Sequence, residues 1–564
     1  MTGGQLNNRW HQRCLKWLCC ASTVALGLGA AGPMMARAQD PAAAAAQARA
    51  APDKFYVAAF DVAGAKLLDP SLVEAAVYDF TGPDRTAADI EAARKALEDA
   101  YKKRGYEAVQ IEIPPQPEAM FAQGIVQLRV TEAPIGRVQV TGARYHSLKV
   151  VRDNLPSVVE GQVLNTKALE TDLANANRFP DRSVSPSFKA GAVPGTIDVD
   201  LAVEDSLPLH GSLELNNDHS PSTVPLRASA SLRYSDLWQR GHMVTATYIA
   251  APQDRKQSEV FSGSYSAPLL GSPWTLILYG YKSNSNVAAL GGVNVLGNGY
   301  QMGARAVYRL PGKASAQNVT FGFDYKNFKQ NISLSSQLTA QAPIEYMPLF
   351  ASYGFSSGTD KANLDINVSV TAGLRAFKKI RCFEVDPANC SATTQFDQFK
   401  NHDFDSNENF VHANFDLAYK RAFLGDFVAA AKLYGQIADS HLVTNEQFAI
   451  GGLASVRGYF QSEAVGDMGY AVSLELGTPS LAPRLPDFVD ELRLFGFVEH
   501  GQARIIHPQP GQTASQSLLS VGSGGRIKLF KHVSGELSVG VPLKDGPSTK
   551  ANAVRTTFSA KSEF

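Results

Sequence analysis

The residue with the clearest chemical potential in this sequence is an arginine inside a glycine-rich segment. Residues 451–460 read GGLASVRGYF, so Arg457 stands between Val456 and Gly458 and is followed by Tyr459. A guanidinium group keeps its charge and offers planar donors that match a carboxylate in a bidentate contact. Arg457 is therefore suited to an ion pair with a carboxylate. The alternative is that it is a solvated loop arginine.

Other candidate chemistry is sparse. Cys382 and Cys390 are close in sequence, and in an oxidising compartment this spacing predicts one small disulfide. A metal site is disfavoured because no second ligand pair accompanies them. The sequence has no G-x-S-x-G elbow and no H-E-x-x-H motif, so we assign no catalytic residue, no cofactor and no metal ligand.

The N-terminus has the pattern of an export signal. A basic start precedes an apolar run, and Ala36–Ala38 fits an A-x-A cleavage site. We expect a signal peptide over residues 1–38 and a flexible Ala-rich leader over residues 39–53. The apolar run falls short of the roughly 20 residues that a membrane-spanning helix needs. Three of the five cysteines would leave with the signal.

Two α+β modules are expected next, over residues 54–133 and 134–206. The first has a helical face formed by Ile90, Ala93, Leu97 and Tyr101, with a cap-like start at Thr86 and a stop at Gly105. The second repeats the order of strand, helix and strand. Val62-Ala63-Gly64-Ala65 and Val140-Thr141-Gly142-Ala143 stand at equivalent places, which favours tandem repeats over one mixed domain.

From residue 207 to residue 564 the pattern has a period of two. About sixteen alternating segments are separated by connections that are short after even segments and longer after odd ones, as in an outer-membrane barrel. One Pro-rich turn near residues 478–487 is longer than this rule predicts. The final strand alternates through Phe558 and ends at the aromatic residue Phe564, a pattern typical of barrels inserted by the barrel-assembly machinery. The fold class is thus α+β modules followed by an all-β, sixteen-stranded transmembrane barrel.

In the segment LFGFVEHGQA, alternation gives each side chain a face. Phe495, Phe497 and Glu499 would point into the barrel, whereas the even-numbered positions would face lipid: Leu494, Gly496, Val498 and His500. A charged glutamate inside a protein-filled barrel is costly unless it is paired.

Two tandem modules, a sixteen-strand barrel and a V-R-G-Y segment resemble the transporter half of two-partner secretion, the TpsB family. The resemblance implies that the modules are POTRA domains and that the sixth extracellular loop folds back into the barrel. It further implies that the loop arginine meets an acidic residue in an F-x-D-x-G pattern. Phe497, Glu499 and Gly501 match this pattern, with Glu in place of Asp.

The implied function is that of a pore in the outer membrane of a Gram-negative cell. An unfolded partner protein, an adhesin or a haemolysin-like exoprotein, would bind the POTRA domains in the periplasm and cross without ATP. The partners are then this exoprotein, outer-membrane lipid and the barrel-assembly machinery. Many family members also carry a pore-plugging helix, and residues 39–53 are too few for one with its linker, at about 1.5 Å per helical residue. Either the plug is absent or the cleavage site differs.

Three rival functions stay open at this point. An insertase of the same superfamily usually has three or more POTRA domains, and this chain has room for about two. A passive or uptake porin would leave the modules and the V-R-G-Y segment unexplained, and an outer-membrane enzyme lacks a motif. Nucleic-acid binding is disfavoured because Lys plus Arg equal Asp plus Glu, with 53 of each.

Overall fold

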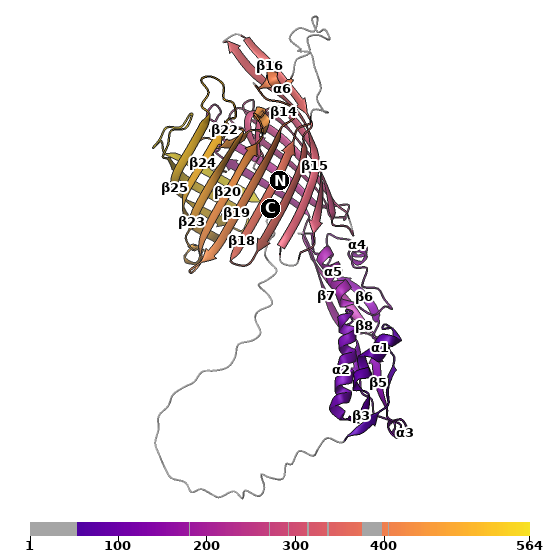
Figure 1. Ribbon diagram of the computed structural model, residues 1–564. Helices are drawn as coiled ribbons and strands as arrows, with labels where there is room; N and C mark the ends of the chain where they lie inside the picture. The colour runs from indigo at the N-terminus through magenta and orange to yellow at the C-terminus, as the bar shows by residue number, and fades with distance from the viewer. Residues whose placement is uncertain are drawn as a thin grey trace, which may run out of the picture. The chain divides into compact units, whose positions relative to one another are not determined.

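The computed structural model describes residues 54–564 except 180, 270, 291–292, 313–314, 336–337, 375–397 and 404. The chain divides into two compact units between Ser206 and Leu207 (Figure 1). The first unit holds two α+β modules, and the second is a β-barrel. Among the described residues, no helix is long and apolar enough to cross a membrane.

The first module packs helices on a three-stranded sheet of order β2-β5-β4, in which β2 and β5 are parallel. The N-terminal segment of this module forms two strands: β1 pairs with β3, and β2 joins the sheet. Its elements are β1 (Phe55–Val57), β2 (Ala59–Ala63), α1 (Pro70–Val77), η1 (Tyr78–Phe80), β3 (Gly82–Arg85), α2 (Ala87–Lys103), β4 (Gln110–Glu112), α3 (Glu118–Phe121) and β5 (Ile125–Thr131).

Helix α2 forms where the apolar spacing predicts it. Its buried residues are Ile90, Ala93, Leu97 and Tyr101. The carboxylate of Asp89 accepts hydrogen bonds from the backbone N–H and the hydroxyl of Thr86, 2.8 Å each, which caps the helix start.

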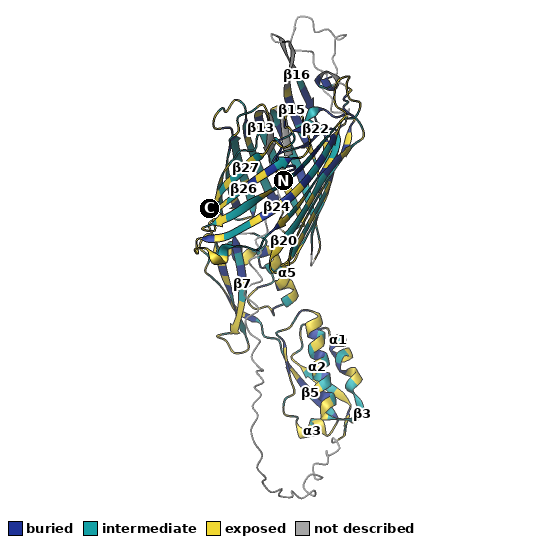
Figure 2. Cartoon of the chain, turned by 90° about the vertical axis from the view of Figure 1, so that its left-hand side faces the viewer, coloured by how far each residue is buried: buried dark blue, intermediate teal, exposed yellow. Residues whose placement is uncertain are grey.

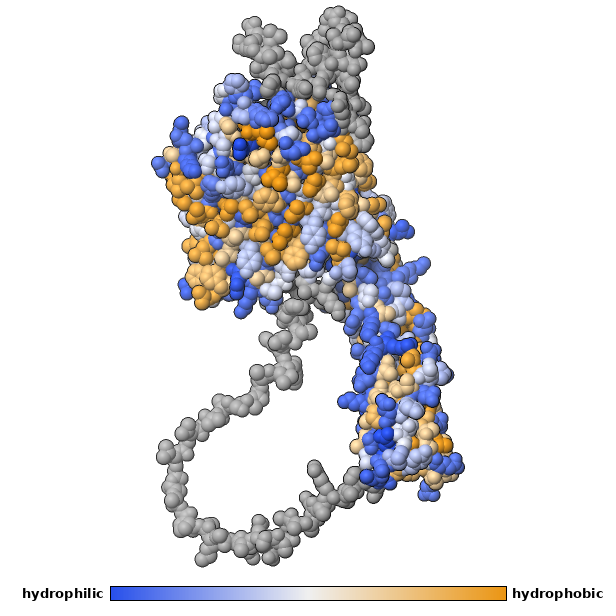
Figure 3. All heavy atoms as spheres, in the orientation of Figure 1, coloured by the Kyte–Doolittle hydropathy of each residue, from blue (hydrophilic) through white to orange (hydrophobic). Residues whose placement is uncertain are grey.

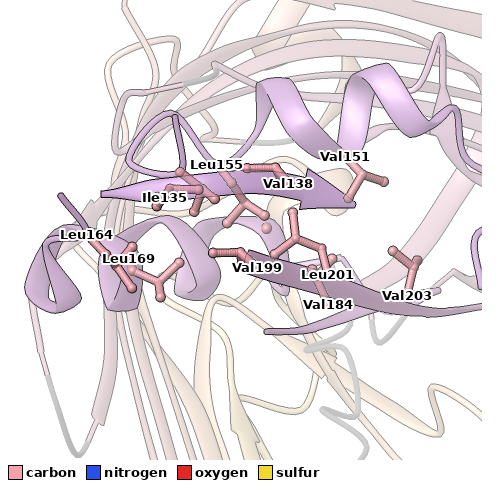
Figure 4. Packing of buried hydrophobic residues seen from close by; sticks show 12 residues of the cluster. Ile135, Val138, Val151, Leu155, Leu164, Leu169, Val184, Val199, Leu201 and Val203 are labelled. Atoms are coloured by element: carbon pink, nitrogen blue, oxygen red, sulfur yellow. The ribbon is translucent and has the colours of Figure 1, made fainter. Parts of the chain in front are cut away.

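The second module repeats this arrangement with a sheet of order β6-β8-β7, in which β6 and β8 are parallel. Figure 4 shows its core, where side chains from the sheet and the helices meet, among them Ile135, Leu155, Leu169 and Leu201. Its elements are β6 (Ile135–Thr141), α4 (Leu148–Asp153), α5 (Thr166–Ala176), β7 (Arg182–Ala190) and β8 (Ile197–Asp205).

Matching glycines support the internal repeat. Gly64 and Gly142 both have positive φ, 93° and 82°. A Cβ on either would lie 2.3–2.4 Å from a carbonyl oxygen of the closing strand, that of Val130 or Val203. Both positions thus require glycine for the same two reasons, the backbone angle and the close approach.

Matching carboxylates close the two modules in the same way. Glu132 follows β5, and its Oε1 accepts from the backbone N–H groups of Lys66 and Leu67, 2.8 and 2.9 Å. Asp205 ends β8 and accepts from the backbone of residues 144–146 at 2.8–3.1 Å. Each carboxylate fixes the turn that follows the first strand of its sheet.

The second unit is a closed antiparallel barrel. Within the described residues it has sixteen strands, because β16 and β17 are successive parts of one strand that both pair with β15. The strands are β9 (Leu209–Asn216), β10 (Arg227–Leu237), β11 (His242–Ala250), β12 (Glu259–Pro268), β13 (Trp274–Leu290), β14 (Val293–Leu310), β15 (Ser315–Ser335), β16 (Leu338–Tyr346), β17 (Leu349–Gly358), β18 (Ala362–Ala372), β19 (Val411–Phe423), β20 (Phe427–Ala438), β23 (Met468–Gly477), β24 (Val489–Arg504), β25 (Ser515–Leu529), β26 (Val533–Pro542) and β27 (Arg555–Glu563).

Alternation along β24 follows the sequence pattern. Phe495, Phe497 and Glu499 are buried, whereas Leu494 and Val498 are 50% and 49% exposed. Figure 2 shows this change of burial along the strands, and Figure 3 shows apolar side chains gathered on the middle of the outer wall. The barrel therefore has an apolar exterior and a polar, filled interior, as a membrane barrel requires.

Connections differ between the two ends of the barrel. At the end where β9 begins they are mostly tight turns, and the predicted longer turn carries η5 (Ala482–Arg484) between β23 and β24. At the other end lie the longer connections, including α6 (Gln398–His402) and the segment between β20 and β23.

Candidate functional site

The connection between β20 and β23 carries the V-R-G-Y motif. It contains η4 (Thr444–Glu446) and a hairpin of β21 (Phe448–Ile450) with β22 (Ala464–Gly466). We call residues 451–463, which this hairpin presents, the loop tip. Gly451 and Gly452 have φ of 111° and 92°, so two glycines turn the chain where the tip begins.

Arg457 of the loop tip contacts Glu499 of β24. Its backbone N–H donates to Glu499 Oε2 at 2.6 Å, and its Nε and Nη2 donate to Oε1 at 2.9 and 2.6 Å. Ser473 Oγ of β23 adds a further hydrogen bond to Oε1 at 2.8 Å. Arg457 and Glu499 are 5% and 3% exposed. Because Glu499 faces the interior, the loop tip lies against the inner wall of the barrel.

Three further charged residues surround this pair. Glu475 of β23 accepts from Arg457 Nη2 at 3.2 Å, and Glu536 of β26 lies 3.6 Å from its Nη1. Arg526 of β25 bonds both of these carboxylates. The five side chains form what we call the Arg457 cluster. Each carboxylate has a guanidinium partner, which offsets the cost of burying charge.

Aromatic rings provide the floor of the cluster. The Arg457 guanidinium lies 3.7 Å from the ring centroid of Phe497, and that of Arg526 lies 4.1 Å from Phe495. The two rings extend over Gly522 and Gly524 of β25, where a Cβ would come within 2.5 Å of a ring atom. Glycine in the neighbouring strand thus makes room for both phenylalanines.

Glycines also let the loop tip approach the wall. A Cβ on Gly501 would lie 3.1 Å from both Val456 and Ile450, so this glycine leaves space for two side chains of the loop. Gly458, with φ of 95°, faces Gly540 of β26, where a Cβ would lie 2.7 Å from the Gly458 nitrogen. The backbones of loop and wall therefore approach each other more closely than side chains would allow.

Tyr459 and Glu463 attach the loop tip to β25 and to the segment that follows β26. The Tyr459 hydroxyl lies 3.0 Å from the carbonyl oxygen of Leu519 and 2.8 Å from that of Lys544. The Glu463 carboxylate accepts from the backbone of Ser548 and Thr549 at 2.6 and 2.7 Å. Each of the four motif residues thus has a defined contact or backbone angle.

A second set of contacts holds the base of the same connection. Glu446 is buried and accepts from Lys326 Nζ and the Tyr346 hydroxyl, 2.5 Å each, with His412 Nε2 at 3.3 Å. Burial alone would raise the pKa of Glu446, but Lys326 and His412 outweigh it and lower the pKa to about 2. Glu446 is therefore ionised at neutral pH.

His441 lies between two carboxylates beside this base. Its Nδ1 is 2.9 Å from Asp467 Oδ2, and its Nε2 is 3.3 Å from Asp403 Oδ1. Hydrogen bonds to Asp403 and Asp467 raise the pKa of His441 to about 10. Asp467 also accepts from the backbone N–H groups of Leu442 and Ile506, so it ties together two separate connections.

The last residue closes the barrel. Phe564 exchanges two backbone hydrogen bonds with Gly211 of β9, 3.0 and 3.1 Å, and its ring covers Gly211, where a Cβ would clash at 2.2 Å. Phe558 pairs with the outward-facing Leu537 and so lies on the exterior face of β27, and Phe564, which follows this strand, is exposed as well.

The structure thus brings the two sequence motifs together and adds residues that the motifs do not contain. Glu475, Arg526 and Glu536 occupy interior-facing positions, and a charge at such a position is the signal that could have indicated them. Cys382 and Cys390 lie outside the described residues, as do the signal peptide and leader. Within residues 54–564 as described, no group of His, Cys, Asp and Glu could hold a metal ion.

A closed barrel with an apolar exterior, following α+β modules, defines an outer-membrane protein of the POTRA-and-barrel class. The family model of haemolysin secretion/activation proteins (ShlB/FhaC/HecB) matches residues 195–527, and that of the ShlB-type POTRA domain matches residues 55–133. The chain belongs to the haemolysin secretion/activation family. It is a transporter of the outer membrane whose POTRA region lies in the periplasm and which secretes a partner protein, as the TpsB resemblance predicted.

Individual relatives are distant in sequence. The outer membrane transporter CdiB of Dickeya dadantii is 23% identical over 447 residues, which cover 78% of this chain and 75% of that protein. The structure of CdiB from Escherichia coli has a TM-score of 0.61 at 17% identity, with 92% of each chain covered. BamA from Haemophilus ducreyi lacking POTRA domains 1–3 has a TM-score of 0.53 at 12% identity, covering 90% of this chain and 100% of that one. These structural likenesses concern the fold alone.

Proposed function

We propose that the Arg457 cluster holds the loop tip against the inner wall in the resting transporter, and that secretion requires both this attachment and its release. The observation that carries this proposal is the burial of Arg457 with three hydrogen bonds to Glu499, from an element that is otherwise a connection between strands. The loop tip is not part of the barrel sheet, so it can detach without breaking the strand pairing of the barrel.

The partner is an unfolded adhesin or haemolysin-like exoprotein. Residues 54–133 and 134–206 act as two POTRA domains that bind it in the periplasm, and residues 207–564 form the barrel that it crosses. The matched glycines and carboxylates of the two modules support treating the second as a POTRA domain. Direction comes from folding of the partner outside, because folding removes the unfolded chain from the pore.

Assembly of the transporter uses its C-terminus. Phe558 and Phe564 form the signal that the barrel-assembly machinery recognises, and Phe564 then pairs with Gly211 to close the barrel. Outer-membrane lipid surrounds the apolar exterior.

The experiment compares secreted and outer-membrane proteomes of cells with and without this gene, complemented with wild type, Arg457→Ala or Arg493→Ala. Arg493 is the matched control, since it is an interior arginine paired with Glu491 outside the cluster. Wild type and Arg493→Ala should restore the missing exoprotein, whereas Arg457→Ala should lower its secretion at least tenfold for an equal amount of folded barrel.

Other outcomes separate the rivals. A general loss of outer-membrane barrels in the deletion strain would indicate an assembly factor. Unchanged proteomes would contradict secretion altogether, and full restoration by Arg457→Ala would contradict the role given to the loop tip.

A further inference from the structure

On the outer wall over β23–β26, the side chains change from apolar to polar toward the end of the barrel where the connection between β20 and β23 lies. Lower on the wall, the outward side chains are apolar and exposed: Leu474, Leu476, Leu494, Val498 and Leu537. Higher up they are Tyr470, His500, Gln502, Arg504, Ser515 and Ser517, with Lys544 just beyond β26. Strand register requires that partners share a face, and Gln502 pairs with Ser517 while Arg504 pairs with Ser515.

Hydrogen bonds link these polar side chains into one group. His500 Nε2 lies 3.2 Å from Ser517 Oγ, to which Lys544 Nζ also donates at 3.0 Å. Gln502 Nε2 donates to Ser515 Oγ at 2.9 Å, and the rings of Tyr470 and His500 are 5.6 Å apart. Nearly all of these groups are donors, which suits an anionic ligand.

Among the described residues, no carboxylate forms an ion pair with Arg504 or Lys544. In the described part of β23–β26, none of the outward residues at this level is acidic. The nearby acids are occupied within loops: Asp545 accepts from the backbone of Ala551, and Glu463 binds Ser548 and Thr549. Arg504 is exposed, and among the described residues the Lys544 ammonium has the Ser517 hydroxyl as its one hydrogen-bond partner.

The position of the group matches the boundary of the membrane. From Leu492 to Gln502, β24 advances about 33 Å at roughly 3.3 Å per residue. At a tilt of about 40° this corresponds to a height of about 25 Å, the thickness of the apolar band of such barrels. Gln502 and Arg504 therefore lie where the hydrocarbon ends, on the side opposite the turn that joins β25 to β26.

We propose that Arg504, Lys544, His500 and Ser517 form a site for the phosphate of an anionic glycolipid headgroup in the outer leaflet. The acyl chains of that lipid would lie on the apolar wall below, over Val498 and Leu494. The phosphate would take the two cations as partners and accept from the Ser517 hydroxyl.

The test is native mass spectrometry of the full-length protein in detergent with added bisphosphorylated lipid A. The variants are Arg504→Ala, Lys544→Ala and the double variant. Lys531→Ala is the matched control, an exposed lysine in the turn at the other end of β25 and β26. Removal of one cation should weaken binding about fivefold, because a charge near an anionic headgroup contributes on the order of 1 kcal/mol. In the double variant, binding of lipid A should be about 25-fold weaker.

Two further probes identify the ligand chemistry. Dephosphorylated glycolipid should bind the wild type as weakly as lipid A binds the double variant. Inorganic phosphate at millimolar concentration should not displace lipid A, because it lacks the apolar contacts.

Equal binding of lipid A by the wild type and the double variant would overturn the proposal, as would equal loss in Lys531→Ala. Displacement by inorganic phosphate would also overturn it, since the site would then bind an anion without the lipid. The heat-modifiable migration of each variant checks that its barrel is folded.

Discussion

Two buried arginines in this barrel have the same chemistry and different attachments. Arg305 of β14 donates from Nη2 to Asp324 of β15 at 2.8 Å, and Arg457 bonds Glu499 at similar distances. Arg305 and Asp324 belong to neighbouring strands, so their pair joins wall to wall. Arg457 belongs to a connection, so its pair joins loop to wall.

The surroundings of the two pairs are also alike. Arg305 lies 4.3 Å from the ring centroid of Phe350, as Arg457 lies over Phe497. A Cβ on Gly322 would clash with Arg305, so glycine again makes room for the charged side chain. Burial and ion pairing alone therefore do not identify a segment that can detach from the wall. What differs is that Arg305 lies in a strand paired on both sides, whereas Arg457 lies in a loop outside the barrel sheet.

The largest expected effect follows from breaking the wall pair. Arg305→Ala leaves Asp324 buried without its guanidinium in a strand that cannot move away, at a cost of about 3–5 kcal/mol in the free energy of unfolding. Urea unfolding of the barrel in lipid vesicles measures this loss. Secretion per folded barrel should stay at the wild-type level.

The loss of stability in Arg305→Ala is to be compared with the loss in Arg457→Ala. Its loop tip can detach and let water reach Glu499, so its loss of global stability should be smaller than that of Arg305→Ala. Equal losses in the two variants would contradict the distinction between a fixed pair and a releasable one.

Local patterns of the sequence predicted much of this molecule. The four buried positions of α2, the alternation along β24 and the paired glycines Gly64 and Gly142 all follow from short-range spacing. The sixteen-strand barrel follows from the same alternation, summed over many segments.

The rest depends on contacts that spacing does not encode. Glu536 stands opposite Arg526 because of strand register, and register fixes the height at which each interior charge lies. Glu446 lies in a long connection without periodicity, so no pattern indicated its partners on β15, β16 and β19. His441 lies in the same connection, and its partners Asp403 and Asp467 lie outside the strands as well. No sequence feature distinguishes Gly540 from other strand glycines, because its requirement comes from the contact with Gly458.

A smaller change sharpens the loop contact itself. Glu499→Asp withdraws the carboxylate by about one C–C bond, 1.5 Å. It then cannot bond both the backbone N–H and the guanidinium of Arg457. The loss should be about 2 kcal/mol, so that the detached tip becomes roughly 30-fold more populated.

Hydrogen exchange of the backbone amides in residues 453–461 measures this population. Ser473→Ala is the milder control, because it removes only one hydroxyl contact to Glu499. Unchanged exchange in Glu499→Asp would mean that the two separate contacts to Arg457 do not set the attachment of the tip.

The smallest expected effect concerns the base of the connection and depends on pH. The pKa of His441 is raised from 6.5 to about 10, so its charged form is favoured by folding. The stabilisation is therefore fully present below about pH 6.5 and is lost as the pH rises through about 10. His441→Gln keeps a donor but no charge, and should lower the thermal unfolding midpoint by a few degrees at pH 6.

The difference between wild type and His441→Gln is the quantity to follow, because it cancels the pH response of every other group. It should shrink steadily above pH 7 and vanish near pH 10.5. A difference that does not change with pH would mean that His441 contributes through packing and neutral hydrogen bonds rather than through its charge between Asp403 and Asp467. The base of the connection would then be held in place regardless of the protonation of His441, as the Arg305–Asp324 pair is, and only the loop tip would be releasable.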